Sequence, residues 1–140
     1  MSVEFIDSNV FIYLFDETAP EKQRAAEELI LPSLESGSAC ISFQVVQETL
    51  NVVTRKLRAP MPPADARRFL DSVLIPLWRV MPTQALYHRA LDLRTRYQYG
   101  FYDALIIAAA LEAGCSILYS EDLQHGQRIE GLTIKNPFAG

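Results

Sequence analysis

Two acidic residues follow directly on apolar strand patterns, where a carboxylate could take part in chemistry. Asp7 closes the pattern that runs from Val3, and Asp122 comes soon after the apolar run at 116–119. Open α/β sheets place their functional sites beyond the carboxyl ends of parallel strands. We therefore expect Asp7 and Asp122 to meet at one edge of a sheet.

Two further acids lie on apolar helical faces. Glu48 shares a face with Val45 and Val52, and helical periodicity places Asp103 with Ile106, Ile107 and Ala110 rather than on the solvent side. A carboxylate on an apolar face is unfavourable unless it is paired or binds a cation. Glu48 and Asp103 therefore join the candidate site.

A divalent cation would account for all four acids together. Neighbouring carboxylates repel and raise one another's pKa, and a bound cation relieves that repulsion. Oxygen ligands without histidine or cysteine suit Mg²⁺ or Mn²⁺. Such ions activate water and stabilise charge on a phosphodiester, and two of them about 4 Å apart can clamp both the attacking and the leaving oxygen.

Each acid also has a simpler structural role open to it. Asp7 could cap the next helix, Asp103 could favour a helix N-terminus electrostatically, Asp122 could serve a turn, and Glu48 could lie near the surface. The shared pattern of two strand ends and two apolar faces favours the metal site.

The elements that must position these acids alternate along the chain. The predicted strands cover 3–7, 39–41, 78–81, 116–119 and 132–134, and the predicted helices cover 10–15, 18–31, 43–57, 64–75, 83–97 and 101–110. Alternation of this kind predicts a three-layer α/β/α domain with a mostly parallel sheet of four or five strands.

Local signals give the expected helix ends. Thr18 and Glu21 form a capping box, Pro32 is expected to bend or end the second helix, Ser42 is expected to cap the third, and Pro76 is expected to close the helix at 64–75. Gly114 stands where a left-handed helix end is needed.

Composition bounds the class of protein. The 140 residues carry a net charge of −4 and are 49% hydrophobic, which indicates one domain over 1–140 and disfavours a generally basic nucleic-acid binder. No apolar run reaches membrane-span length and no signal peptide is recognisable, so a cytoplasmic location is expected. Two cysteines and two histidines lack zinc-ligand spacing, and Cys40 and Cys115 are expected to be buried free thiols.

Cations that could contact a phosphate backbone cluster at Arg55, Lys56, Arg58, Arg67 and Arg68, although a solvated helix face is the simpler interpretation.

The sequence resembles the PIN-domain ribonucleases, and among them the VapC-type toxins of toxin–antitoxin pairs. The resemblance covers nearly the whole chain in order. Its motifs are Phe5-Ile6-Asp7-Ser8-Asn9, the stretch from Ser42 to Asn51 around Glu48, Tyr102-Asp103-Ala104-Leu105-Ile106, and Leu118-Tyr119-Ser120-Glu121-Asp122-Leu123-Gln124-His125-Gly126.

This resemblance implies a set of roles. Asp7, Glu48, Asp103 and Asp122 would be the catalytic, metal-binding acids, with Asn9 and Ser120 bordering the site. It also implies Mg²⁺- or Mn²⁺-dependent hydrolysis of RNA, a homodimer, and inhibition by a cognate antitoxin. Phe11, Tyr13, Leu14 and Phe15 support the dimer if they form an exposed patch, and equally could fill the core.

Alternatives from other classes stay open. An aspartyl phosphatase would place a second acid two residues after Asp7, where Asn9 stands, and a receiver-like domain would need paired acids where Ser8 follows Asp7. A housekeeping RNA-processing nuclease, or a PIN-like pocket that binds partners without cleaving, would share the same four acids.

Overall fold

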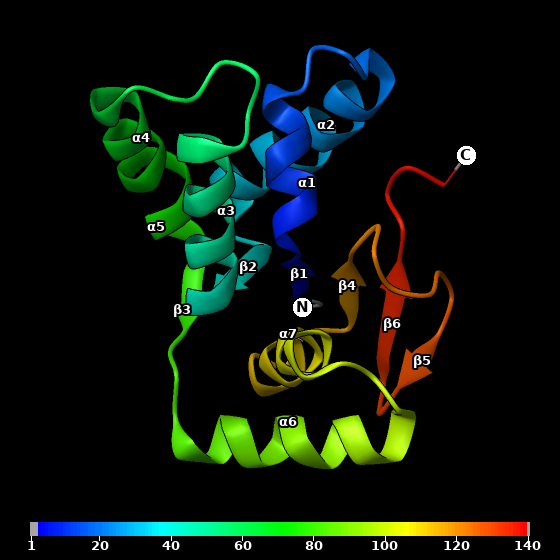
Figure 1. Cartoon of the computed structure of the whole chain (residues 1–140). Helices are drawn as coiled ribbons and strands as arrows, with labels where there is room; N and C mark the ends of the chain where they lie inside the picture. Colours follow the sequence, from blue (N-terminus) through cyan, green and yellow to red (C-terminus); the bar gives the residue numbers. More distant parts are fainter. Residues whose placement is uncertain (1–2, 140) are drawn as a thin grey trace.

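A parallel sheet forms the centre of the computed structural model, which describes residues 3–139 (Figure 1). The strand order is β3-β2-β1-β4-β6-β5, and every neighbouring pair is parallel except β5 with β6. The strands are β1 Glu4–Ile6, β2 Ala39–Ser42, β3 Trp78–Val80, β4 Ile117–Tyr119, β5 Arg128–Ile129 and β6 Leu132–Lys135. The fold class is therefore the predicted one.

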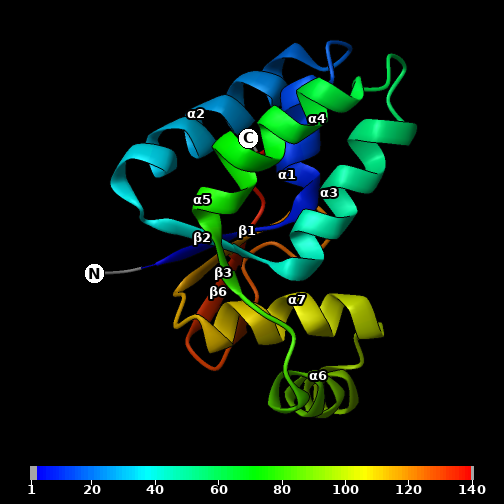
Figure 2. The same ribbon diagram turned by 90° about the vertical axis from the view of Figure 1, so that its left-hand side faces the viewer.

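Helices cover both faces of the sheet. Figure 2 shows α1 to α5 on one side and the packed pair α6 and α7 on the other, which confirms three layers. The helices are α1 Ser8–Ile12, α2 Pro20–Ser36, α3 Phe43–Arg55, α4 Pro63–Phe69, α5 Ile75–Leu77, α6 Gln84–Tyr97 and α7 Phe101–Glu112, with a 3₁₀ turn at Tyr13–Phe15 and a π turn at Leu70–Leu74.

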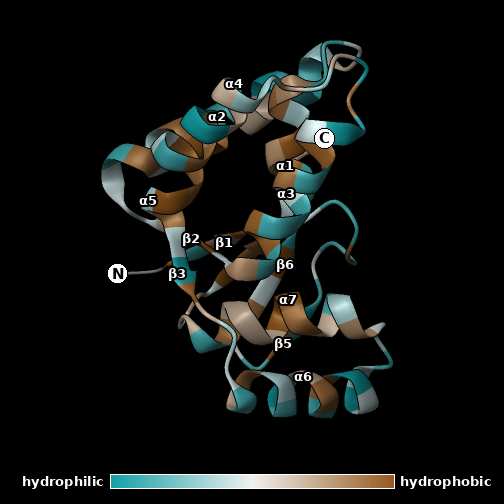
Figure 3. Cartoon of the chain, turned by 60° about the vertical axis from the view of Figure 1, so that its left-hand side comes forward, coloured by the Kyte–Doolittle hydropathy of each residue, from teal (hydrophilic) through white to brown (hydrophobic). Residues whose placement is uncertain are grey.

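The core fills both faces of the sheet. Residues 104–110 of α7 are all buried, so this helix is apolar on nearly every side, whereas α6 outside it mixes polar and apolar residues (Figure 3). On the other face, Phe11 is fully buried and Phe15 meets Phe69 edge-on, with ring centroids 5.1 Å apart. Tyr13 and Leu14 also pack against the core. These four residues do not form the exposed patch that would have supported a dimer, and the dimer stays a prediction.

Three predicted details are confirmed, namely the cap of α3, the left-handed residue after α7 and the two free thiols. The Ser42 side chain accepts a hydrogen bond from the Val45 amide and caps α3, and Gly114 follows α7 with a φ of 74°. Cys40 and Cys115 are buried free thiols whose sulfur atoms lie 3.5 Å apart. No helix among residues 3–139 combines the length and apolar character that crossing a membrane requires.

The sheet has six strands rather than four or five. The extra strand, β5, is two residues long and pairs antiparallel with β6 across Glu130 and Gly131, which both have positive φ. So short a strand has no periodic pattern to reveal it.

Three predicted helix ends are wrong. The capping box does not form, because Asp16 takes the hydrogen bonds of both the Thr18 amide and the Thr18 hydroxyl. Helix α2 continues through Pro32 to Ser36 and ends at the left-handed Gly37, since proline already has a helical φ and removes only one hydrogen bond. Pro76 lies inside α5 and does not close the preceding helix.

Candidate active site

All four predicted acids line one cavity of about 280 Å³ at the carboxyl edge of the sheet. Asp7 directly follows β1, and Asp122 follows β4, which is the parallel neighbour of β1. Glu48 comes from α3, and Asp103 comes from the first turn of α7. Four separate elements therefore bring a carboxylate to the same space.

Asp7 is the most buried of the four, at 6% exposed. One carboxylate oxygen accepts from the Ser8 amide at 2.7 Å and so caps α1, and the other accepts from the Ser120 hydroxyl at 2.8 Å. Burial, with a smaller contribution from the charges of Glu48 and Asp122, raises the pKa of Asp7 to about 6, although these two hydrogen bonds lower it. Asp7 is thus both a helix cap and a carboxylate held in an environment that disfavours its charge.

Two polar neighbours hold Glu48. Its Oε1 accepts from the Ser8 hydroxyl at 3.0 Å, and its Oε2 accepts from Gln44 Nε2 at 3.3 Å. The same Gln44 nitrogen donates to the Tyr102 carbonyl at 3.1 Å, so it connects α3 to the start of α7.

Gln44 is 4% exposed and lines the cavity, yet its Oε1 has no hydrogen-bond partner among the described residues. Buried acceptors without a partner are uncommon in folded proteins. Gln44 was not among the sequence-predicted residues. The sequence feature that could have identified Gln44 is its position one helical turn before Glu48, on the same face of the helix.

Asp103 differs from its sequence-based placement. Ile106, Ile107 and Ala110 are buried as expected, but Asp103 itself is exposed, because it stands at the open mouth of the cavity, where α7 begins. Partial burial still raises the pKa of Asp103, and the nearby charge of Asp122 adds to this. The two carboxylates therefore repel each other across the cavity.

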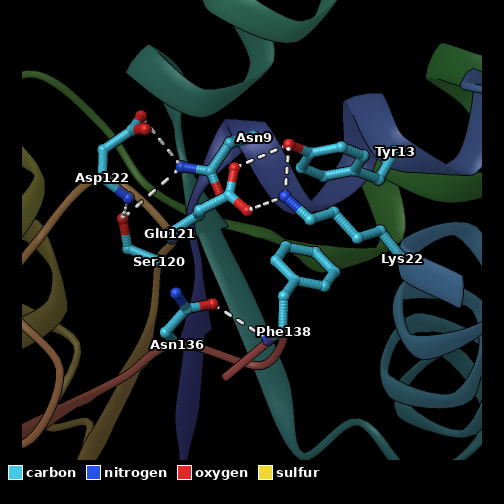
Figure 4. A network of polar contacts seen from close by, with 8 residues as sticks. All are labelled: Asn9, Tyr13, Lys22, Ser120, Glu121, Asp122, Asn136 and Phe138. Carbon is cyan, nitrogen blue, oxygen red and sulfur yellow. Dashed lines mark hydrogen bonds and ion pairs between the residues drawn. The ribbon is translucent and has the colours of Figure 1, made fainter. Parts of the chain in front are cut away.

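Asn9 and Ser120 organise the loop that carries Asp122 (Figure 4). Asn9 Nδ2 donates to Asp122 Oδ2 at 3.1 Å and to the Ser120 hydroxyl at 3.4 Å, and Asn9 Oδ1 accepts from the Glu121 amide at 3.2 Å. The Asp122 amide donates to the fully buried Ser120 hydroxyl at 3.2 Å. Both residues therefore border the acids.

Glu121 points away from the four acids. Its carboxylate accepts from the Tyr13 hydroxyl and pairs with the Lys22 ammonium, each at 2.6 Å (Figure 4). The Lys22 nitrogen also lies over the rings of Tyr13 and Phe138. Although partial burial opposes it, the hydrogen bonds from Lys22 and Tyr13 lower the pKa of Glu121. The sequence offered no local signal for this cluster, because Glu121 is about 100 residues away from both Tyr13 and Lys22.

The five predicted RNA-contacting cations are all exposed, and they differ in position. Lys56, just after α3, lines the acidic cavity, whereas Arg55, Arg58, Arg67 and Arg68 do not. Arg68 pairs with Asp65 on its own helix. Lys56 is the only cationic side chain in the cavity wall, within the part of the chain that the structure describes.

The donor set fits a hydrated hard cation. The cavity offers the carboxylate groups of Asp7, Glu48, Asp103 and Asp122. No three acidic, histidine or cysteine side chains within residues 3–139 are gathered closely enough to form a ready metal cluster. Mg²⁺ tolerates this spacing because it keeps several of its waters and uses only one or two carboxylates directly.

Comparison with known proteins agrees with this architecture. The model of the PIN domain family matches residues 5–128. No curated protein matches the chain in sequence.

Solved structures share the fold at low sequence identity. A toxin–antitoxin complex from Klebsiella pneumoniae has a TM-score of 0.68 at 20% identity, and covers 98% of each chain. DNA-bound VapBC from Salmonella typhimurium has a TM-score of 0.68 at 17% identity, with 98% of this chain and 99% of the other covered. The VapC20 toxin of Mycobacterium tuberculosis, described as cleaving the sarcin-ricin loop, has a TM-score of 0.59 at 21% identity, with 85% and 91% covered.

Proposed function

Because the chain belongs to the PIN domain family, we propose that it is a cytoplasmic, metal-dependent endoribonuclease. The observation that carries the proposal is the convergence of four carboxylates from β1, α3, α7 and the loop after β4 on one cavity. A fold shared with many proteins would not by itself support an activity, whereas this donor set does.

The residues of the cavity would have three roles, namely binding the metal ion, positioning its ligands and attracting the phosphate. Asp7, Glu48, Asp103 and Asp122 would hold Mg²⁺ or Mn²⁺, which when bound activates water and stabilises the charge that develops on the phosphodiester. Ser8 and Gln44 fix the two oxygens of Glu48, and Ser120 fixes Asp7. Lys56 supplies a positive charge in the cavity wall that attracts a phosphate to an otherwise acidic site.

We further propose that the chain is the toxin of a toxin–antitoxin pair, with an antitoxin protein as partner. The similar structures include toxins in complex with antitoxins, and the fold is shared over nearly the full length of both chains. Unpaired or loop RNA is the expected substrate, since its backbone can bend into a cavity and its bases are open. We also propose a homodimer, which sedimentation at micromolar concentration tests directly.

The test is cleavage of a mixed single-stranded RNA pool by the purified chain with Mg²⁺ or Mn²⁺, freed of any antitoxin. Asp103→Asn should abolish cleavage while the fold stays intact, because it removes one ligand charge at nearly constant shape. Asp92→Asn, an exposed acid on α6 outside the cavity, is the matched control and should cleave normally. Equal cleavage by wild type and Asp103→Asn would refute the nuclease assignment.

Expression in cells separates the toxin from a housekeeping nuclease. Growth arrest by the wild type, relieved by Asp103→Asn or by a small protein encoded next to it, supports the toxin. A wild type that cleaves RNA without arresting growth supports the housekeeping alternative instead.

A further inference from the structure

Tyr102 is the most exposed large apolar side chain among residues 3–139, at 68%. It lines the same cavity as the four acids and directly precedes Asp103 in the first turn of α7. A tyrosine ring left in water at this level gains little from the core of its own protein. Its position beside the candidate metal acids makes the ring available to a molecule that binds in the cavity.

The Tyr102 ring is supported from one side by a row of aromatic side chains. Phe101 meets it edge-on, with centroids 5.5 Å apart, and Phe101 in turn stacks on Tyr87 of α6 at 6.4 Å. Tyr87 then meets Phe43, a buried residue at the start of α3, at 6.5 Å. The row runs from the core to the cavity mouth and ends on the exposed ring.

The backbone of Tyr102 is fixed as well. Its carbonyl accepts a hydrogen bond from Gln44 Nε2, the same nitrogen that holds Glu48. The position of the ring is therefore coupled to the position of one of the acids. A ring held in this way can bind a flat partner without losing much conformational freedom.

We propose that Tyr102 stacks on an unpaired nucleobase of the RNA beside the scissile phosphate, which rests on the proposed nuclease function. Base–aromatic stacking is available to every base and needs no charge, so it can hold RNA next to carboxylates that repel the phosphates. A base inside a duplex is already stacked on its neighbours and is not free to do this. Tyr102 thus selects for substrates with an unpaired base next to the cleaved bond.

The experiment compares Tyr102→Ala and Tyr102→Trp with wild type on one single-stranded oligoribonucleotide that the wild type cleaves. Tyr102→Ala should raise KM by about 5- to 150-fold, the range that corresponds to the loss of one stacked base. Tyr102→Trp should keep KM near the wild-type value because it keeps an aromatic face. Leu91→Ala, which removes an exposed apolar side chain outside the cavity, is the matched control and should change nothing.

Abasic substitution along the same oligonucleotide identifies the base. An abasic site at one position next to the cleaved bond should raise the KM of the wild type as much as Tyr102→Ala does. The same abasic site should not raise the KM of Tyr102→Ala any further. Independent, additive losses would overturn the stacking assignment.

Two other outcomes are also informative. Cleavage that is insensitive to Tyr102→Ala refutes this inference alone, including the case in which the variant changes only antitoxin affinity. A wild type that cleaves no RNA refutes the proposed function and this inference together.

Discussion

Asp7→Asn should stabilise the metal-free protein at neutral pH, although it removes the most buried acid of the candidate site. The Asp7 carboxyl is 6% exposed, and its pKa is raised from 3.8 to about 6, chiefly by burial. Its folded-state pKa exceeds its unfolded value. The stability associated with this group is therefore fully present below about pH 3.8 and is lost as the pH rises through 6.

The size of the effect follows from the pKa difference. Each pH unit between the two pKa values corresponds to about 1.4 kcal/mol, so ionised Asp7 destabilises the fold by about 3 kcal/mol above pH 7. Asparagine carries no charge, and its carbonyl can still accept the hydrogen bond of the Ser8 amide. It cannot reproduce both carboxylate contacts, so we expect a net gain of about 1–3 kcal/mol in the free energy of unfolding at pH 7.5. Near pH 4 the gain should shrink by about 2 kcal/mol, because Asp7 is then largely protonated in the folded wild type.

Urea unfolding in EDTA at pH 4 and pH 7.5 measures this directly. At about 1.5 kcal/mol per molar, the expected gain moves the midpoint of Asp7→Asn upward by about 1–2 M at pH 7.5. Asp92→Asn, with its exposed side chain, should unfold like the wild type at both pH values. Millimolar Mg²⁺ should narrow the difference, since it stabilises the wild type more than the variant. A variant that is less stable than the wild type at pH 7.5, or a gain that grows toward pH 4, would refute the reasoning.

Two further substitutions test the neighbours of the acids. Gln44→Leu should weaken Mn²⁺ binding about ten-fold or more, because Gln44 donates a hydrogen bond to the proposed ligand Glu48. Gln47→Leu, at an exposed position on the same helix, is the control. A paramagnetic titration of Gln44→Leu that matches the wild type would contradict this expectation. Lys56→Ala should weaken RNA binding and flatten the slope of log K against log salt by about 0.7, whereas the exposed Arg24→Ala outside the cavity should do neither.

The arrangement of the fold could be predicted from the sequence where the pattern was periodic. Strand and helix patterns gave the layers and the parallel sheet, because each spans several residues of one period. Helix ends were harder, since they depend on competing local partners. Thr18 could have capped α2, but its amide and hydroxyl donate to the side chain of Asp16, two residues earlier, and α2 has no side-chain cap.

The candidate site could be predicted in its charged residues but not in their support. Carboxylates at strand ends and on apolar faces are conspicuous in a sequence, and the four acids do surround one cavity. Gln44 and Tyr102 are inconspicuous by comparison, because a glutamine in a helix and a tyrosine at a helix start are common. What connects them is one hydrogen bond between residues 58 positions apart in the chain.

The adjacent acids Glu121 and Asp122 show how distant residues set the charge of the cavity. Either carboxylate could have joined the site from the loop after β4, and a fifth carboxylate would have increased the repulsion among the others. Lys22 of α2 and the hydroxyl of Tyr13 hold Glu121 outside the cavity, while Asn9 of α1 holds Asp122 at its edge. Since Lys22 and Tyr13 do not line the cavity, the number of acids that face the cavity depends on the packing of α1, the 3₁₀ turn and α2 against the loop. The same contacts explain why the motif Ser120-Glu121-Asp122 contributes its first and third residues to the site and its second to the structure around it.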